Sequence, residues 1–204
     1  MNAFAALIDE LDQSTGTNRK IDLIAGHLQR QKAHDAAWTV LLLMGERRKR
    51  LITGRRLRDI LQQASAMPDW LFDDCQSHVG DSAETLSLLW PQLRNDIRDR
   101  IHNPVVTKWV NQLSSSPPMH WWMEDLLPAV AKMEPEEQSN AVLAIWESLP
   151  SERLFLFNKL LTGGFRIGVA RGLVVKAIAR GFNLEEALVL ERLMTPGTAS
   201  EQWF

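Results

Sequence analysis

The chain has 204 residues, a formal net charge of -2 and a hydrophobic content of 45%. That length can bury the core of one large domain or two small ones, and the hydrophobic share excludes a disordered protein. The single cysteine, Cys75, excludes an internal disulfide. The nearly balanced charge excludes a uniformly basic nucleic-acid coat but leaves room for local basic patches.

The first residues, MNAFAALIDELDQS, contain three acidic side chains and no basic one, which is not the pattern of a signal peptide. No apolar run approaches the ~20 residues of a membrane-spanning helix. We therefore expect a soluble cytoplasmic protein without a membrane partner. Nothing in the sequence demands more than a monomer.

Apolar residues recur at helical spacing along nearly the whole chain, and no hairpin signal interrupts them. The sequence predicts an all-α fold, a compact multi-helix bundle of about ten to twelve helices that can be arranged as two sub-bundles. The clearest helical patterns, in chain order, cover residues 4–11, 21–28, 38–44, 57–64, 86–89, 141–146, 154–161, 169–179 and 183–193.

Several residues mark predicted helix ends. Thr53 can cap the helix that follows it, and Asp81 with Glu84 has the spacing of a capping box. Pro135 suits the first turn of a helix. Asn183 and Glu186 have the same capping-box spacing before the last pattern.

Four tryptophans, Trp38, Trp70, Trp109 and Trp146, lie within apolar helical patterns. We expect most of them to pack in the core.

The segment Leu113-Ser-Ser-Ser-Pro-Pro118 is a candidate hinge between two sub-bundles, because the charge pattern also changes near it. Residues 46–58 (ERRKRLITGRRLR) hold seven basic side chains and one acid, whereas residues 120–152 hold seven acids and one lysine. From Arg153 to Leu184 there are six basic residues and no acid. The basic charge therefore lies in two blocks within a single domain that covers residues 1–204.

No arrangement typical of catalysis is present. The five histidines are scattered, and the sequence contains no HExxH, GxSxG or phosphate-binding GxxxxGK[ST] motif. Adjacent acidic pairs such as Asp73-Asp74 cannot share a helical face. We expect no catalysis, no cofactor and no metal from this chain alone.

The stretch LLTGGFRIGVARGLVVKAIAR, residues 160–180, predicts an anion site. Gly163 can take the left-handed conformation that ends a helix, and Gly168 and Val169 are expected to begin the next one. The first amides of a helix carry partial positive charge, and Arg166, Arg171 and Lys176 add full charges. A tight helix–helix corner explains the glycines equally well, but the missing acids favour a phosphate.

Two further segments are weaker candidates for phosphate contacts. The block at residues 46–58 can equally be a solvated helix end. The segment Ser-Thr-Gly-Thr-Asn-Arg-Lys, residues 14–20, offers hydroxyls and cations before a helix, with helix capping as the alternative.

The segment FNKLLTGGFRIGVARGLVVKAIA resembles the end of the N-terminal DNA-binding domain of ATP-dependent DNA ligases. Four other segments match in the expected order: FAALIDELDQSTGTNRKIDLIAGHL, DAAWTVLLLMGERRKRLITGRRLRD, MPDWLFDDCQSHVGDSAETLSLL and ERLM. The resemblance covers essentially the whole chain and is greatest to the mid-sized bacterial members.

The resemblance implies an all-helical domain that lies across the minor groove of nicked duplex DNA and contacts backbone phosphates. Gly80 and Asp81 match a family Gly-Asp pair, where capping is the expected role of Asp81. The DNA contacts that the resemblance and the basic blocks together predict are Thr15, Thr17, Lys20, Arg47, Arg48, Lys49, Arg50, Arg55, Lys159, Thr162, Gly163, Gly164, Arg166, Gly168, Val169, Arg171 and Lys176.

The sequence departs from the family in one respect. The ligases accept AMP on the lysine of a K-x-D-G motif, and this chain has no such motif. We therefore expect an N-terminal domain without the nucleotidyltransferase and OB-fold domains. ATP and Mg would belong to the parent ligase, and the partners would be nicked double-stranded DNA and the catalytic domains. The bacterial nucleoid is the expected location when DNA is bound.

Two other functions stay open on the sequence. Residues 153–180 can form the helix-turn-helix of a sequence-specific regulator, although VARGLVVKAIAR offers few side chains that read base edges. A helical protein-interaction scaffold, with the glycines needed only for packing, is the third reading.

Overall fold

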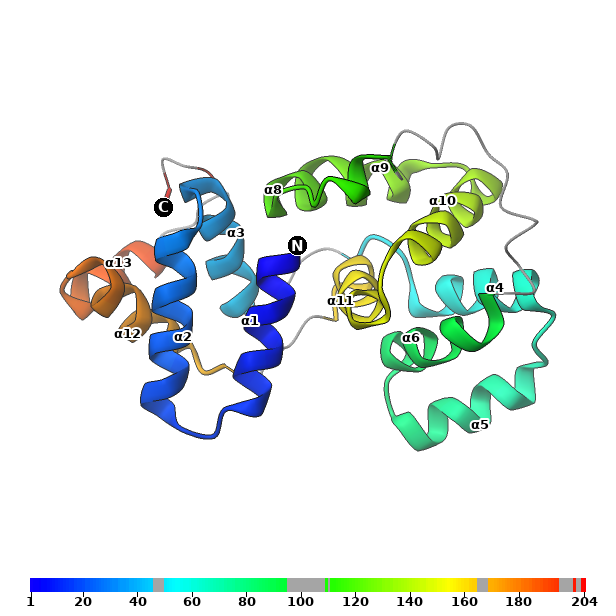
Figure 1. The fold of residues 1–204 in the computed structure, drawn as a ribbon, viewed down its shortest axis with the longest axis horizontal. Coiled ribbons are helices and arrows are strands. Elements are labelled where there is room, and N and C mark those ends of the chain that lie inside the picture. Colours follow the sequence, from blue (N-terminus) through cyan, green and yellow to red (C-terminus); the bar gives the residue numbers. More distant parts are fainter. Residues whose placement is uncertain (46–49, 95–108, 110, 165–168, 195–199, 201–202) are drawn as a thin grey trace. The chain divides into compact units, whose positions relative to one another are not determined.

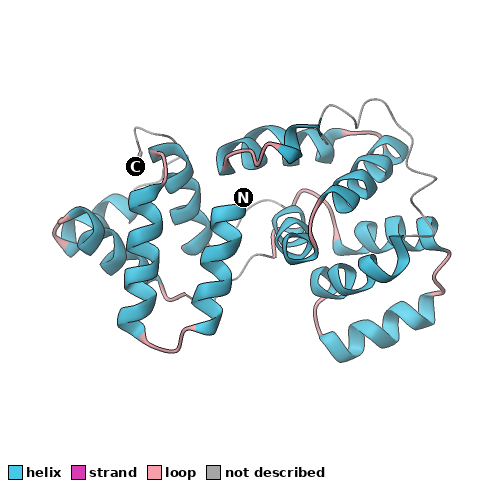
Figure 2. Cartoon of the chain, in the orientation of Figure 1, coloured by secondary structure: helices cyan, strands magenta, loops and turns pink. Residues whose placement is uncertain are grey.

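The computed structural model describes residues 1–45, 50–94, 109, 111–164, 169–194, 200 and 203–204 (Figure 1). These residues form twelve α-helices, one π-helical segment and no strand (Figure 2). The predicted all-α class is therefore confirmed. The chain divides into two compact units: unit 1 comprises Met1–Arg47, Pro118–His120 and Phe165–Phe204, and unit 2 comprises Arg48–Pro117 and Trp121–Gly164.

Unit 1 combines the two ends of the chain. Its helices are α1 (Asn2–Gln13), α2 (Thr17–Arg30), α3 (Ala33–Leu43), α12 (Arg171–Phe182) and α13 (Glu186–Met194), with the first residues of α8 (Met119–Trp121). Helix α2 packs on both α1 and α12, and α12 also contacts α3 and α13. At Gly181 a Cβ would lie only 3.3 Å from the Cβ of Ala25, so this glycine permits the close approach of α12 to α2.

The sequence pattern explains which faces unit 1 buries. In α1, Phe4, Leu7 and Leu11 recur at helical spacing and are all buried. Helix α3 is buried on nearly every side, in agreement with its continuous apolar run and including Trp38.

Polar side chains inside unit 1 are paired. The buried His27 lies with Nε2 3.4 Å from Oγ1 of Thr39, which donates in turn to the carbonyl of Asp35. The Asp35 carboxylate accepts hydrogen bonds from the backbone N–H and the Nδ1 atom of His120, at 2.9 and 2.8 Å. Asp35 thereby ties the short segment Pro118–His120 to the rest of unit 1.

Unit 2 contains α4 (Gly54–Ser65), α5 (Asp69–Val79), α6 (Ser82–Leu93), the π-helical segment η3 (Trp122–Leu126), α9 (Leu127–Lys132), α10 (Pro135–Ser148) and α11 (Ser151–Thr162). Helix α6 packs against α4, α5 and α11, and α10 contacts both α4 and α9.

Aromatic rings fill the core of unit 2. The rings of Trp90 and Trp146 lie 5.3 Å apart and tilted, and both side chains are buried. Nε1 of Trp146 donates to Oδ1 of the buried Asn158 at 2.9 Å, and the Asn158 amide donates to the carbonyl of Ala83. One asparagine therefore joins α10, α11 and the start of α6.

The local end signals were largely right. Thr53 accepts the N–H of Arg56 at 3.0 Å, and Asp81 accepts the N–H of Glu84 at 3.0 Å, as their capping spacings predict. Pro135 is the first residue of α10. Asn183 is a correction: it ends α12 with a left-handed φ of 53° and does not cap α13.

The tryptophan expectation also needs a correction. Trp38 and Trp146 are buried, but Trp70 is 69% exposed. Trp70 lies in the first turn of α5, two positions before the buried Phe72, so the two side chains point to nearly opposite sides of the helix.

The predicted hinge over residues 113–118 ends where the chain passes from unit 2 into unit 1, after Pro117. That the segment bends stays a prediction.

The burial of His27 predicts acid sensitivity. Burial, together with the positive charge of Arg30, lowers the pKa of His27 from 6.5 to about 4. The unfolded chain therefore takes up a proton near pH 6.5 and the folded chain only near pH 4, so stability falls as the pH falls through this window. The difference corresponds to about 3 kcal/mol of unfolding free energy.

His27→Gln should remove most of this loss, as judged by urea unfolding at about pH 7 and about pH 4. An equal loss of unfolding free energy in the variant and the wild type would mean that His27 is not the sensitive group.

Candidate nucleic-acid interface

The glycine turn begins as its sequence predicts. Helix α11 ends at Thr162, and Gly163 follows with a left-handed φ of 65°. Oγ1 of Thr162 donates back to the carbonyl of Asn158 at 2.9 Å, which closes the last turn. Gly164 is exposed. The two residues after α11, Gly163 and Gly164, therefore present backbone without side chains.

An anchored segment brings Arg50, a residue of the other basic block, to this turn. The backbone N–H groups of Leu51 and Ile52 both donate to the carbonyl of Leu161, each at 3.0 Å. A carbonyl in the last turn of a helix has no partner inside the helix, so these two bonds satisfy it from outside. Arg50, next to Leu51 and exposed, is thereby held beside the glycine turn.

Helix α4 starts directly after the anchored segment. Its first turn contains no acid, and Arg55 is exposed there. A Cβ at Gly54 would lie 2.9 Å from Oγ of Ser82, so the glycine lets the start of α4 approach the start of α6. We call the group formed by Arg50, Arg55, Thr162, Gly163 and Gly164 the turn surface; all five residues belong to unit 2.

The remaining arginines of α4 have structural partners. Arg56 donates to Oε1 of Gln138 at 3.1 Å, to Oγ of Ser139 at 2.9 Å and to the carbonyl of Pro135, all in α10. Arg58 pairs with Asp69 and Asp73 of α5. Neighbouring arginines of one block therefore serve different purposes, which their spacing did not reveal.

Lys159 also has a structural partner. Its Nζ pairs with Oδ2 of Asp81, the residue that caps α6. Partial burial would raise the pKa of Asp81, but the hydrogen bonds from Lys159 and from the amide of Glu84 outweigh it, and the pKa lies below its ordinary value. The sequence predicted Lys159 as a DNA contact, which stays a prediction; in the structure its ammonium group is paired with the Asp81 carboxylate.

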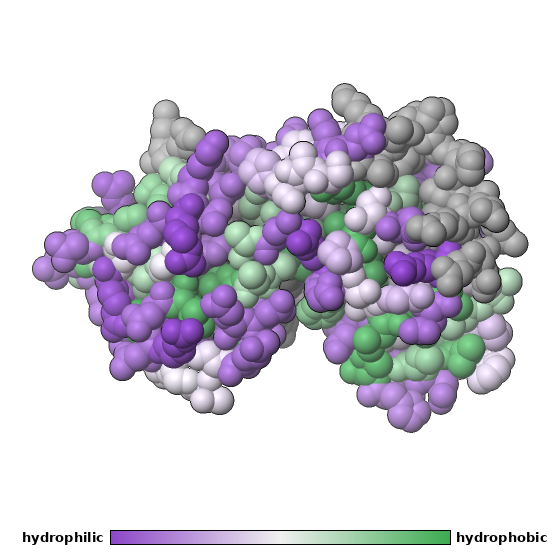
Figure 3. Space-filling view, viewed as in Figure 1, coloured by the Kyte–Doolittle hydropathy of each residue, from purple (hydrophilic) through white to green (hydrophobic). Residues whose placement is uncertain are grey.

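In unit 1, α2 starts without a capping side chain. Its N-cap is Gly16, no side chain accepts from the first amides, and the first turn contains no acid. Thr15 and Thr17 are exposed, and Lys20 is half-buried. The alternative prediction, that these hydroxyls cap α2, is therefore wrong. Polar side chains cover the outward face of this helix (Figure 3).

Helices α2 and α12 present several of the predicted contacts together. Thr17 and Lys176 line one surface pocket of about 470 Å³. Arg180 and two acidic residues, Glu185 and Glu186, line the same pocket. Nη1 of Arg180 is paired with Asp22 at 2.6 Å. We use the name α2–α12 surface for five predicted contacts on or next to these two helices: Thr15, Thr17, Lys20, Arg171 and Lys176. Of these five, Thr17 and Lys176 line the shared pocket.

The start of α12 differs from the prediction. The helix begins at Arg171, with Ala170 as its N-cap, so Val169 precedes the helix and does not open it. No side chain caps this start and its first turn contains no acid. A Cβ at Gly172 would meet nothing within 4 Å, so the first turn is open to a ligand.

Five predicted contacts lie outside the described residues: Arg47, Arg48, Lys49, Arg166 and Gly168. Among the residues that the structure describes, no group of three or more His, Cys, Asp and Glu side chains could hold a metal ion. No helix in the described part of the chain is long and apolar enough to cross a membrane.

A family model described as DNA ligase N terminus matches residues 1–179. The chain belongs to this DNA ligase family. The matched range contains the glycine turn and the three segments before it that carried the resemblance, whereas the fourth segment, ERLM at residues 191–194, lies beyond it. No curated protein matches the chain.

Two contacts in this ligase chain were beyond sequence reasoning: the Leu51 and Ile52 bonds to Leu161, and the Asp81–Lys159 pair. Both join residues far apart in the sequence. The only local signal was the capping spacing at Asp81.

The two roles of Asp81 predict graded effects on stability. Asp81→Ala should lower the unfolding free energy by about 1–2 kcal/mol, because the cap of α6 and the pairing of Lys159 are both lost. Asp81→Asn should cost less, because an asparagine still caps. Thermal unfolding of both variants is the measurement, and equal losses would contradict separate cap and charge roles.

Substitution of the neighbouring arginines Arg55 and Arg56 should affect the unfolding free energy to different extents. Arg56→Ala should lower the unfolding free energy by about 1–3 kcal/mol, because it leaves acceptors in α10 without their donor. Arg55→Ala, the matched control, should change it by less than about 0.5 kcal/mol, because Arg55 is exposed. Denaturant unfolding compares the two, and a larger loss for Arg55→Ala would refute the assignment.

Proposed function

We propose that this chain binds the backbone phosphates of nicked duplex DNA, in the minor groove and without sequence preference, as the DNA-binding domain of an ATP-dependent ligase. The observation that carries the proposal beyond the family match is the Leu51 and Ile52 anchor. It brings Arg50 of the first basic block to the glycine turn of the second.

The chemistry of both surfaces suits phosphate better than bases. The turn surface combines two exposed arginines with a glycine backbone that a phosphate can approach closely. The α2–α12 surface combines two helix starts that lack capping side chains with hydroxyls and cations. Phosphate contacts position a protein on DNA but do not read its sequence.

The chemical step would belong to other domains. Without a K-x-D-G motif the chain supplies no lysine for AMP transfer, so ATP and Mg would act in the catalytic domains of the parent ligase. The role of this chain would be to hold the nick while those domains seal it in replication, repair and recombination. It would act as a monomer in the cytoplasm, at the nucleoid when DNA is bound.

The helix-turn-helix alternative is less well supported by the geometry. Residues 163–170 separate α11 from α12, whereas a helix-turn-helix needs a turn of about 3–4 residues. The exposed side chains along α12 include Arg171, Lys176 and Arg180 but no asparagine or glutamine. Few groups would therefore discriminate between bases.

The decisive experiment is fluorescence anisotropy with nicked and intact duplexes of several sequences, at two or more salt concentrations. We expect binding that is nearly independent of sequence and stronger at the nick. With about five phosphate contacts, log K should fall with log[salt] at a slope of about -4 to -5.

Arg50→Ala and Lys176→Ala probe the two surfaces. Each should weaken binding about fivefold to tenfold and reduce the salt slope by about one, because one charged phosphate contact is lost. Lys132→Ala in unit 2 and Lys32→Ala in unit 1 are matched controls, since both are exposed lysines that belong to neither surface.

Three results would count against the proposal. Preference for one duplex sequence without preference for a nick would favour the regulator. Absence of salt-sensitive DNA binding would favour the interaction scaffold. Equal weakening by the control lysines would indicate diffuse attraction and no defined surface.

A further inference from the structure

Arg171 occupies an unusual electrostatic position. It is the first residue of α12, where the helix start carries partial positive charge and disfavours a cation. The first turn of α12 has no acid to offset it. Such a side chain needs a negative partner, either from a ligand or from elsewhere in the fold.

Helix α13 supplies such a partner. Nη2 of Arg171 donates to the carbonyl of Leu193 at 3.1 Å. Leu193 lies in the last turn of α13, where carbonyls have no partner inside the helix and carry partial negative charge. One bond therefore satisfies one carbonyl at the end of α13 and fixes the Arg171 guanidinium against that helix.

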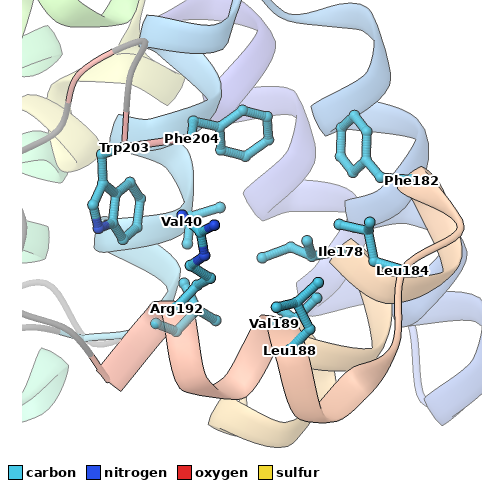
Figure 4. A pocket seen from close by; sticks show the side chains of 10 residues that line it. Val40, Ile178, Phe182, Leu184, Leu188, Val189, Arg192, Trp203 and Phe204 are labelled. Carbon is cyan, nitrogen blue, oxygen red and sulfur yellow. The ribbon is translucent and has the colours of Figure 1, made fainter.

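Only one face of α13 fixes its position. Val189 and Leu193, four residues apart, are buried, whereas Leu190 and Met194 are 42% and 67% exposed. The inner face borders an apolar pocket of about 340 Å³, where Val189 and Ile178 lie close together and Trp203 and Phe204 lie on other sides (Figure 4). Because the pocket leaves part of the inner face of α13 without packing partners, few buried side chains hold this helix in position.

We propose that α13 is a brace that positions the Arg171 guanidinium for a DNA phosphate. This inference rests on the proposed function and adds to it a positioning role for a helix that lies beyond residues 1–179, the part matched by the ligase family. A guanidinium has five N–H donors, so the bond to Leu193 leaves donors for phosphate. Holding the side chain in advance removes part of the entropy cost of ordering it on DNA.

The test measures the affinity for a nicked duplex by anisotropy in a double-mutant cycle. The inner pair Val189→Ala and Leu193→Ala loosens the brace, and the outer pair Leu190→Ala and Met194→Ala is the matched control on the same helix. We expect the inner pair to weaken binding about threefold to tenfold and the outer pair less than about twofold.

The coupling to Arg171 separates positioning from general loosening. In an Arg171→Ala background the inner pair should have almost no further effect, because the side chain that the brace holds is gone. Arg171→Lys is a second variant that leaves the packing of α13 untouched. A single ammonium cannot replace the planar fork, so this variant should bind more weakly than wild type and be insensitive to the inner pair.

Each outcome has one meaning. Normal binding by the inner pair would overturn the brace and leave the proposed function standing, and so would equal weakening with and without Arg171. Normal binding by Arg171→Ala would do the same, because Arg171 would then serve α13 alone. If the wild type shows no salt-sensitive DNA binding, the proposed function itself fails.

Discussion

The carbonyl of Leu161 joins the end of α11 to the segment that leads into α4. A helix must end with carbonyls that lack internal partners, and here one of them accepts from both Leu51 and Ile52. That pair of bonds fixes the segment before α4, and with it the cap at Thr53 and the direction in which α4 leaves. Arg50 of the first basic block lies beside the glycine turn because the Leu161 carbonyl takes its donors from the two residues that follow Arg50.

The rest of α11 extends the same principle. Asn158 faces inward, where it takes the N–H of Trp146 and donates to the carbonyl of Ala83. The next residue, Lys159, reaches the Asp81 carboxylate at the start of α6. Buried polar groups cost stability unless they are paired, so these pairings allow few alternative placements of α6, α10 and α11. The turn surface is consequently built at the end of a helix, α11, whose polar side chains are paired with α6 and α10.

Features set by local chemistry were predictable from the sequence. The all-α class, the caps at Thr53 and Asp81, and the left-handed Gly163 depend on residues within a few positions of one another. Asn183 was misread because asparagine both caps a helix start and tolerates a left-handed φ at a helix end; only the length of α12 decides between the two. The exposed Trp70 shows that an apolar residue near a helix start need not point inward.

The sequence could not tell an available cation from an occupied one. Arg55 and Arg56 are adjacent and chemically identical, yet Arg56 is committed to acceptors in α10, more than 70 residues away in the chain, by bonds that no spacing rule predicts. Lys159 looks like part of a basic stretch until Asp81 is placed beside it. A basic block therefore overstates the charge that a ligand would meet.

At helix starts, cations with a structural partner can be told apart from cations that are available to a ligand. A cation at the start of a helix costs stability, and the fold offsets that cost for Arg56 with acceptors from α10 and for Arg171 with a carbonyl from α13. Arg55 is exposed, and among the residues that the structure describes none accepts a hydrogen bond from its side chain or forms an ion pair with it. A bound phosphate would offset the same cost at Arg55, because the first amides of a helix and an arginine both attract an anion.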